Sequence, residues 1–367
     1  YNYPHVAAAH WVMYRLARNY VGLVSQESWE TYLEHAYQTG LAMMKHAPHY
    51  AQFGQMEGTI FLMILKDLKL EKWDEQAADF EKVMRARAEH WASLNYPFGS
   101  EMPWDSTGQE EVYMWSRYFG FNERADVTLN AILAYMPTVP HWAYNGNARR
   151  YWDFLYGGKI SRVERQIHHY GSALNSIPVL HQYRENPDDL YLLRVGYGGV
   201  LGGISNITQD GFGPCAFHSF PSTLAIDALS GDYGTGFFGY AVNTASLLMN
   251  HDEFGWLTFG GNYKEEGDWA VIELTTAAKS NVYIAPIKLS LSLEAGKFSS
   301  VAYNKKTNVV KCVLDKASQH TPNALLRIEQ KGQSKPAYGL KNSTPDARGL
   351  YNIKLDKAGT VISLQSK

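Results

Sequence analysis

The chain between residues 99 and 113 combines carboxylates with an aromatic ring. It reads Gly-Ser-Glu-Met-Pro-Trp-Asp-Ser-Thr-Gly-Gln-Glu-Glu-Val-Tyr. A carboxylate beside a Trp ring is what a sugar site uses for hydrogen bonds to hydroxyls or for acid–base catalysis. An ordinary acidic helix N-terminus would give the same pattern. The candidates here are catalytic Glu101 and Glu110 and substrate-binding Trp104, Asp105 and Gln109.

A second segment, residues 140–153, is rich in aromatic and imidazole rings and carries two adjacent arginines. Arginine can form a bidentate pair with a carboxylate, so a uronic acid could be held here. Packing of the segment against the next helix is the alternative. The candidate substrate-binding residues are Trp142, Tyr144, Asn145, Arg149 and Arg150.

A third segment, residues 162–175, contains His168, His169 and Tyr170, with Asn175 one turn further on. This set suits removal of a proton alpha to a carboxylate. Arg and Asn would neutralise the carboxylate, His or Tyr would take the C5 proton, and Tyr would protonate the leaving oxygen. The sequence thus predicts β-elimination on a uronic acid, stabilised mainly by electrostatics. His218 is a further binding candidate.

Two other classes of function remain open. A glycoside hydrolase would need a carboxylate pair, here Glu57 or Glu101 with Asp105 or Glu110. A non-catalytic glycan-binding protein would need only the aromatic residues. The products distinguish the three classes, because only a lyase forms an unsaturated uronate that absorbs in the ultraviolet.

Several familiar chemistries are missing from the sequence. It contains no Gly-x-Gly-x-x-Gly after a strand, no His-Glu-x-x-His and no Gly-x-Ser-x-Gly. Its two cysteines, Cys215 and Cys312, are far apart in sequence and support neither a disulfide framework nor a zinc site. We therefore predict no metal ligands and no cofactor, and leave a use of Ca²⁺ open.

Composition favours a carbohydrate partner. The 367 residues carry a net charge of −2, so the basic excess expected for nucleic-acid binding is missing, and no apolar stretch is long enough for a membrane helix. Aromatic residues reach 14%, and Tyr and Trp offer both an apolar face and a polar group to a sugar ring. We expect a polysaccharide or oligosaccharide substrate.

The chain begins at Tyr1, which suggests a processed or truncated form, and we expect a secreted or periplasmic protein.

The elements that must position these residues change type near residue 252. Up to about 250, apolar residues recur at helical spacing, and we expect helices over 5–22, 27–46, 55–69, 73–94, 106–119, 122–135, 160–184, 188–204, 218–230 and 234–250. Asp105 or Ser106 would cap the helix over 106–119. From 253 the pattern predicts strands, with a final hairpin formed by residues 351–355 and 360–364.

The expected fold is therefore multidomain, α then β. Residues 1–252 are predicted to form stacked helical hairpins, an (α/α) toroid that is incomplete or of the six-hairpin type. Residues 253–367 are predicted to form an antiparallel β-sandwich.

Three motifs add a family resemblance. Trp104-Asp-Ser-Thr-Gly-Gln-Glu-Glu-Val-Tyr113, His168-His-Tyr-Gly-Ser172 and Asp232-Tyr-Gly-Thr-Gly-Phe-Phe-Gly-Tyr240, followed by a β-rich tail, resemble a family of large bacterial and fungal glycan-degrading proteins. That family includes lyases that remove rhamnose caps from glucuronate in arabinogalactan. Over residues 1–330 the resemblance implies an (α/α) toroid, a β-sandwich and rhamnose–glucuronate lyase activity. It also implies an N-terminal β-rich region that this chain lacks.

Overall fold

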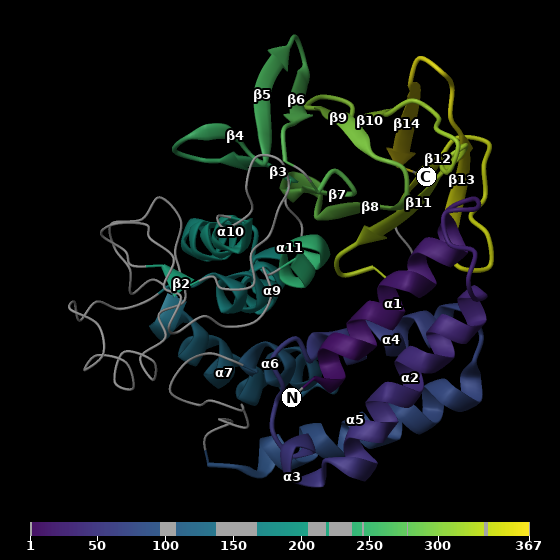
Figure 1. Cartoon of the computed structure of the whole chain (residues 1–367). Coiled ribbons are helices and arrows are strands. Elements are labelled where there is room, and N and C mark those ends of the chain that lie inside the picture. Colours follow the sequence, from purple (N-terminus) through teal and green to yellow (C-terminus); the bar gives the residue numbers. More distant parts are fainter. Residues whose placement is uncertain are drawn as a thin grey trace. The chain divides into compact units, whose positions relative to one another are not determined.

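The structure is a computed structural model (Figure 1). It describes residues 2–95, 108–136, 167–204, 218–219, 237–243, 246–276, 278–333 and 337–366. Only the backbone is described for Tyr135, Phe237 and residues 167–170, 202–204 and 218–219.

Helices dominate the described residues up to 243. Their bounds are α1 Tyr3–Asn19, α2 Trp29–His46, α3 Pro48–Ala51, α4 Thr59–Leu70, α5 Asp74–Ser93, α6 Gln109–Tyr118, α7 Asn122–Tyr135, α9 His169–Glu185, α10 Leu190–Ile204 and α11 Phe237–Val242. Two short strands, β1 Ile167–His168 and β2 His218–Ser219, pair with each other. Among the helices that the structure describes, none is both long and apolar enough to span a lipid bilayer.

Among the longer helices from α2 to α7, helices that bury one face alternate with helices that are buried almost all round. In α6 every side chain from Gln109 to Ser116 is buried, and so is every residue of α9 from 171 to 180. The helices α2, α5 and α7 bury one face only, as in α5, where Phe80, Met84 and Trp91 recur at helical spacing. A buried helix followed by an amphipathic one is typical of stacked helical hairpins. Closure of these hairpins into a toroid stays a prediction.

The chain divides into two compact units. One comprises residues 1–11, 33–182 and 190–243, and the other comprises residues 12–32, 183–189 and 244–367. The first contains the buried helices and the second contains both large sheets. The division into domains 1–252 and 253–367 stays a prediction.

Two six-stranded sheets follow the helices. One has the order β12-β14-β10-β9-β6-β5 and the other the order β13-β11-β8-β7-β3-β4. The strands are β3 Ser246–His251, β4 Gly255–Phe259, β5 Gly261–Glu266, β6 Trp269–Leu274, β7 Asn281–Ile284, β8 Leu289–Ala295, β9 Phe298–Asn304, β10 Val310–Leu314, β11 Asn323–Gln330, β12 Tyr338–Leu340, β13 Leu350–Lys354 and β14 Thr360–Ser366.

The two sheets share one hydrophobic core. In β8 the buried residues Leu289, Leu291 and Leu293 alternate with more exposed ones, as the two-residue period of a strand requires. They belong to the same buried cluster as Ile272 and Val301 of the other sheet. The second unit is therefore a β-sandwich, as the sequence predicts.

Two expectations about these elements were wrong. The helix expected over 234–250 is split into α11 and β3, because Leu247 and Leu248 pair on both sides, with β4 and with β7. A fully buried run of this kind does not reveal its period. Among the described strands within residues 253–367 every pair is antiparallel, as predicted, and β3, which precedes that range, adds a parallel pair with β7. β13 and β14 form no hairpin, since β13 pairs with β11 and β14 with β10 and β12.

A partly buried carboxylate links Arg15 of α1 to the sandwich within the second unit. Glu294 of β8 receives Arg15 Nη2 at 2.7 Å and Arg327 Nη2 at 3.3 Å. Burial by itself would raise the pKa of Glu294, but the two guanidinium groups outweigh it and hold that pKa below its usual value.

Candidate active site

Buried polar side chains gather at the start of two neighbouring helices, α4 and α6. Gln55, Glu57 and Thr59 lie just before or at the beginning of α4, and Glu110 and Glu111 lie in the first turn of α6. The first backbone N–H groups of a helix have no partner within it, and the helix dipole favours negative charge there. We call Glu57, Glu110 and Glu111 the carboxylate cluster.

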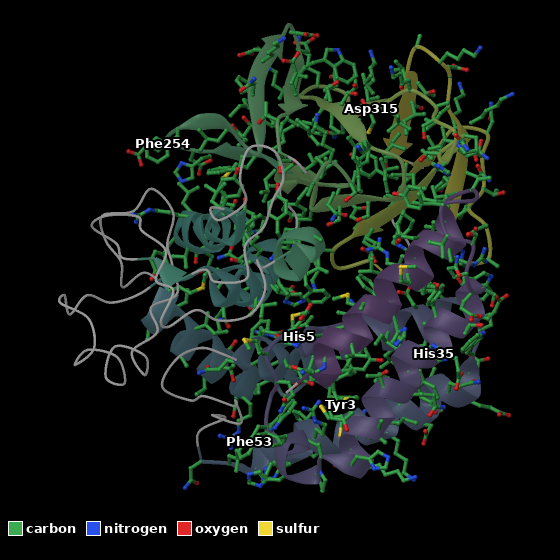
Figure 2. All side chains as sticks on the ribbon, in the orientation of Figure 1. Tyr3, His5, His35, Phe53, Phe254 and Asp315 are labelled. Carbon is green, nitrogen blue, oxygen red and sulfur yellow. The ribbon has the colours of Figure 1, made fainter. Side chains whose placement is uncertain are left out.

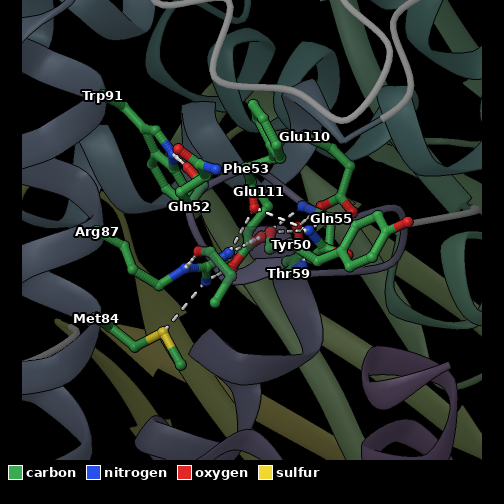
Figure 3. Close-up of polar contacts among 11 residues, drawn as sticks. Tyr50, Gln52, Phe53, Gln55, Thr59, Met84, Arg87, Trp91, Glu110 and Glu111 are labelled. Carbon is green, nitrogen blue, oxygen red and sulfur yellow. Dashed lines mark hydrogen bonds and ion pairs between the residues drawn. The ribbon is translucent and has the colours of Figure 1, made fainter. Parts of the chain in front are cut away.

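Glu111 is held by an ion pair that is hidden from solvent (Figure 3). Its Oε2 accepts hydrogen bonds from Arg87 Nη2 at 2.9 Å and from the backbone N–H of Gln55 at 2.7 Å. Its Oε1 contacts Arg87 Nη1, which completes a bidentate pair. Glu111 is 0% exposed and Arg87 is 6% exposed. Gly58 must be a glycine here, since a Cβ would lie 2.4 Å from the Glu111 carboxyl carbon.

Glu110 has a different environment from its neighbour. Its Oε2 accepts the backbone N–H of Thr59 at 3.1 Å and also the Thr59 hydroxyl. Among the described residues its Oε1 has no hydrogen-bond partner. Complete burial raises the pKa of Glu110 well above its usual value, and the nearby charges of Glu111 and Glu57 add to this. The carboxyl group is therefore neutral over part of the range in which an exposed glutamate is charged.

Glu57 completes the carboxylate cluster. It adopts a left-handed backbone conformation with φ of 67°, which is uncommon for a residue other than glycine. Its Oε2 lies 3.4 Å from Nε2 of His5, whose position Figure 2 shows. All three members of the cluster thus have contacts inside the protein.

Gln109 precedes the cluster at the first position of α6. Its side chain is 0% exposed, and neither amide atom has a hydrogen-bond partner among the described residues. The expected cap by Asp105 or Ser106 was wrong: Gly108 is the N-cap residue, with φ of 80° and no side-chain cap. Only glycine adopts this conformation readily, so Gly108 itself forms the turn at which α6 begins.

The backbone brings two of the predicted segments together. β1 pairs with β2 antiparallel, and His168 lies directly opposite His218. α9 begins at the next residue, His169, so Tyr170 is in its first turn. The helix expected over 160–184 was wrong at this point, because Ile167 and His168 form a strand and α9 begins at His169. Asn175 lies one turn further along α9, is 1% exposed, and donates from Nδ2 to Gly171 O at 2.9 Å.

The remaining predicted residues lie outside the described residues. They are Glu101, Trp104, Asp105, Trp142, Tyr144, Asn145, Arg149 and Arg150. The roles assigned to them, and to His168, His169, Tyr170, Gln109, Glu110, Asn175 and His218, stay predictions. In the parts of the chain that the structure describes, no group of three or more His, Cys, Asp or Glu side chains is placed to hold a metal ion.

Sequence reasoning missed Arg87, although the sequence contained a signal for it. Arg87 occupies a position on the apolar stripe of α5 formed by Phe80, Met84 and Trp91. A charged residue at helical spacing within such a stripe needs a buried partner. Here that partner is Glu111, 24 residues further along the chain.

Comparison with known proteins places the chain in a family. Residues 1–362 match a family of unknown function, DUF5695, and the chain belongs to that family. No curated protein matches it. A solved polysaccharide lyase is similar over 66% of this chain, with a TM-score of 0.48 and 14% sequence identity. The match covers 36% of that lyase, so this chain spans little more than a third of its length.

Proposed function

We propose that this protein is a carbohydrate-active enzyme, a polysaccharide lyase that cleaves a glycosidic bond to glucuronate by β-elimination. The observation that carries the proposal is the β1–β2 pair, in which His168 lies opposite His218. The sequence singled out both segments for their chemistry, although they are far apart along the chain. Their backbone pairing lies at the start of α9, whose first turn holds Tyr170, and this proximity along the backbone supports the proposal.

The proposed reaction needs three roles. Arg149 or Arg150 would pair with the uronate carboxylate, which makes the C5 proton more acidic. His168 or His169, or Tyr170, would take that proton, and Tyr170 would protonate the leaving oxygen. The C5–H and C4–O bonds break, a C4–C5 double bond forms, and the leaving sugar keeps a hydroxyl group. The sequence resemblance supports a rhamnose-capped glucuronate as the substrate.

A glycoside hydrolase is the second candidate, and one observation favours it. A general acid must keep its proton near neutral pH, and the pKa of Glu110 is raised as that role requires. The contacts of Glu110 weigh against it, because Thr59 donates two hydrogen bonds to a carboxyl group that is 0% exposed. Glu57, its possible partner, pairs with His5. These contacts suit a positioning role better than contact with a substrate.

The deciding experiment measures product and turnover on one panel of uronate-containing polysaccharides that includes rhamnose-capped arabinogalactan. The lyase proposal expects ultraviolet absorbance from an unsaturated uronate. It also expects Tyr170→Phe to lower kcat by about 10²–10⁴, the usual effect of losing an acid–base group. Glu110→Gln should then keep most of the turnover. Product without the unsaturated chromophore, abolished by Glu110→Gln, would establish the hydrolase instead.

A glycan-binding protein without activity is the third outcome. It would leave every polysaccharide of the panel intact while still binding at least one of them.

A further inference from the structure

The loop of residues 47–58, which connects α2 to α4 and includes α3, is held in place by side chains of α5. Arg87 donates from Nε to Ala51 O at 2.7 Å and from Nη2 to Phe53 O at 2.8 Å. Trp91 Nε1 donates to Gln52 O at 2.8 Å. Three successive carbonyl groups of the loop are thus fixed by two side chains of α5 (Figure 3).

A third side chain closes the loop on itself. Gln55 Nε2 donates to Tyr50 O at 2.7 Å and to Phe53 O at 3.0 Å, while the Gln55 N–H binds Glu111. Gln55 is 1% exposed. An exposed loop is usually the most mobile part of a domain, so this set of buried contacts gives the loop a fixed shape.

The outer side of the loop presents rings. His49 is exposed, and Tyr50 and Phe53 are half-buried. The His49 ring lies 5.4 Å from that of Tyr50 and 5.9 Å from that of Phe53, with both pairs edge to face. Gln52, also exposed, donates from Nε2 to His49 O at 2.8 Å, which steadies the short helix α3. We call His49, Tyr50 and Phe53 the ring triad.

The loop that carries the ring triad leads into α4, whose first turn contacts the first turn of α6. The loop runs directly into Thr59, which binds Glu110 at the start of α6. The chain enters α6 from residues 96–107, which carry Glu101 and Trp104. Along the chain, the loop 47–58 therefore precedes α4 and residues 96–107 precede α6. The first turns of these two helices are in contact.

We propose that the ring triad is a sugar-binding subsite, in which the rings of Tyr50 and Phe53 pack on the C–H face of a pyranose and His49 hydrogen-bonds a hydroxyl. This inference rests on the proposed function insofar as the ligand is a glycan. Rings with a polar group suit a sugar, which presents an apolar face and a hydroxyl edge. A pre-shaped loop loses little conformational entropy on binding, which favours affinity. The buried contacts of Arg87, Trp91 and Gln55 supply that pre-organisation.

The test uses the full chain and rhamnose-capped arabinogalactan. The double variant Tyr50→Ala with Phe53→Ala should raise the Kd about tenfold or more, as expected for aromatic anchors of a binding site, and raise KM while leaving kcat within about twofold. His49→Ala removes an exposed side chain, so the fold should tolerate it, and should raise the Kd by a few-fold. Phe254→Ala is the matched control, since Phe254 is 59% exposed at the tip of the β3–β4 hairpin (Figure 2) and should leave the Kd unchanged.

The outcomes separate this inference from the proposed function. If the protein binds the glycan without cleaving it and the variants weaken binding, the subsite stands and the lyase fails. If the protein cleaves the glycan while the double variant and His49→Ala keep the wild-type Kd and KM, the subsite is overturned and the lyase stands. Absence of binding by the wild-type protein overturns the subsite as well.

Discussion

Replacing Glu111 with glutamine is expected to destabilise the helical unit strongly. The substitution keeps the size of the side chain and an oxygen that can accept the N–H of Gln55, but it removes the negative charge beside Arg87. Arg87 stays 6% exposed and loses its only carboxylate partner among the described residues. A guanidinium group cannot give up its proton to escape this situation.

The magnitude follows from the burial of both partners. Removing one member of a buried ion pair costs about 3–5 kcal/mol, because the other charge is left uncompensated. Glutamine retains the hydrogen bond from Gln55, which contributes about 1 kcal/mol net, so we expect the lower end, about 3 kcal/mol. With a urea m-value of about 3 kcal/mol/M, the upper end for small proteins, this lowers the midpoint by about 1 M.

Urea unfolding followed by the helical circular dichroism signal measures this effect. Asp126→Asn is the matched control, because Asp126 also pairs with an arginine, Arg117, at 2.5 Å in the same unit but is 59% exposed. An exposed pair contributes about 0–1 kcal/mol, so the control should stay close to the wild-type midpoint. Equal midpoints for Glu111→Gln and Asp126→Asn would refute the claim that burial makes the Arg87–Glu111 pair costly to break.

Three further perturbations have defined outcomes. Because the pKa of Glu110 is raised in the folded protein, the free energy of unfolding should fall as pH rises above the unfolded pKa of about 4.3 and level off only above the folded pKa. Glu110→Gln should abolish this contribution to the pH dependence, measured by thermal unfolding at several pH values. An unchanged pH dependence in the variant would contradict the raised pKa. Gly58→Ala places a Cβ 2.4 Å from the Glu111 carboxyl carbon and should lower the free energy of unfolding in urea by about 1–3 kcal/mol. A variant as stable as the wild type would show that the loop can shift to accommodate the methyl group. The pKa of Glu294 is lowered, so its contribution is present above about 4.3 and is lost as pH falls through the folded pKa. Glu294→Gln should cost about 1.5–3 kcal/mol at neutral pH and make acid unfolding of the sandwich less steep, whereas an unaltered acid transition would exclude this role.

Sequence periodicity was sufficient for most elements of this fold. Amphipathic helices such as α2 and α5 begin and end within a few residues of the expected positions, and strands follow residue 253 as expected, with clear alternation in β8. The run at 246–251 was mistaken for part of a helix because a strand paired on both sides buries consecutive residues and loses its alternation. The final hairpin was mistaken because local spacing cannot show that β13 and β14 belong to different sheets.

The site was less accessible to sequence reasoning, because its contacts are long-range. Glu110 was singled out for its type and for the acidic first turn, yet its hydrogen bonds come from Thr59, 51 positions earlier. The ring triad of loop 47–58 was overlooked, since His49, Tyr50 and Phe53 lie in no recognisable motif. Only the carbonyl groups fixed by Arg87 and Trp91 distinguish this loop from an ordinary connection.

The carboxylate cluster fixes the starts of α4 and α6 through a chain of hydrogen bonds and one ion pair. Glu111 fixes Arg87, Arg87 fixes the loop before α4, and Thr59 fixes Glu110 at the start of α6. Each of these contacts involves the first turn of α4 or α6 or the loop that leads into α4, so these side chains fix how both helices begin. The hydrogen bonds and burial of these carboxylates suit a positioning role better than contact with a polysaccharide chain. Under the proposed function, acid–base work therefore falls to His168, His169 and Tyr170 at the start of α9, and the cluster acts by holding α4, α5 and α6 together.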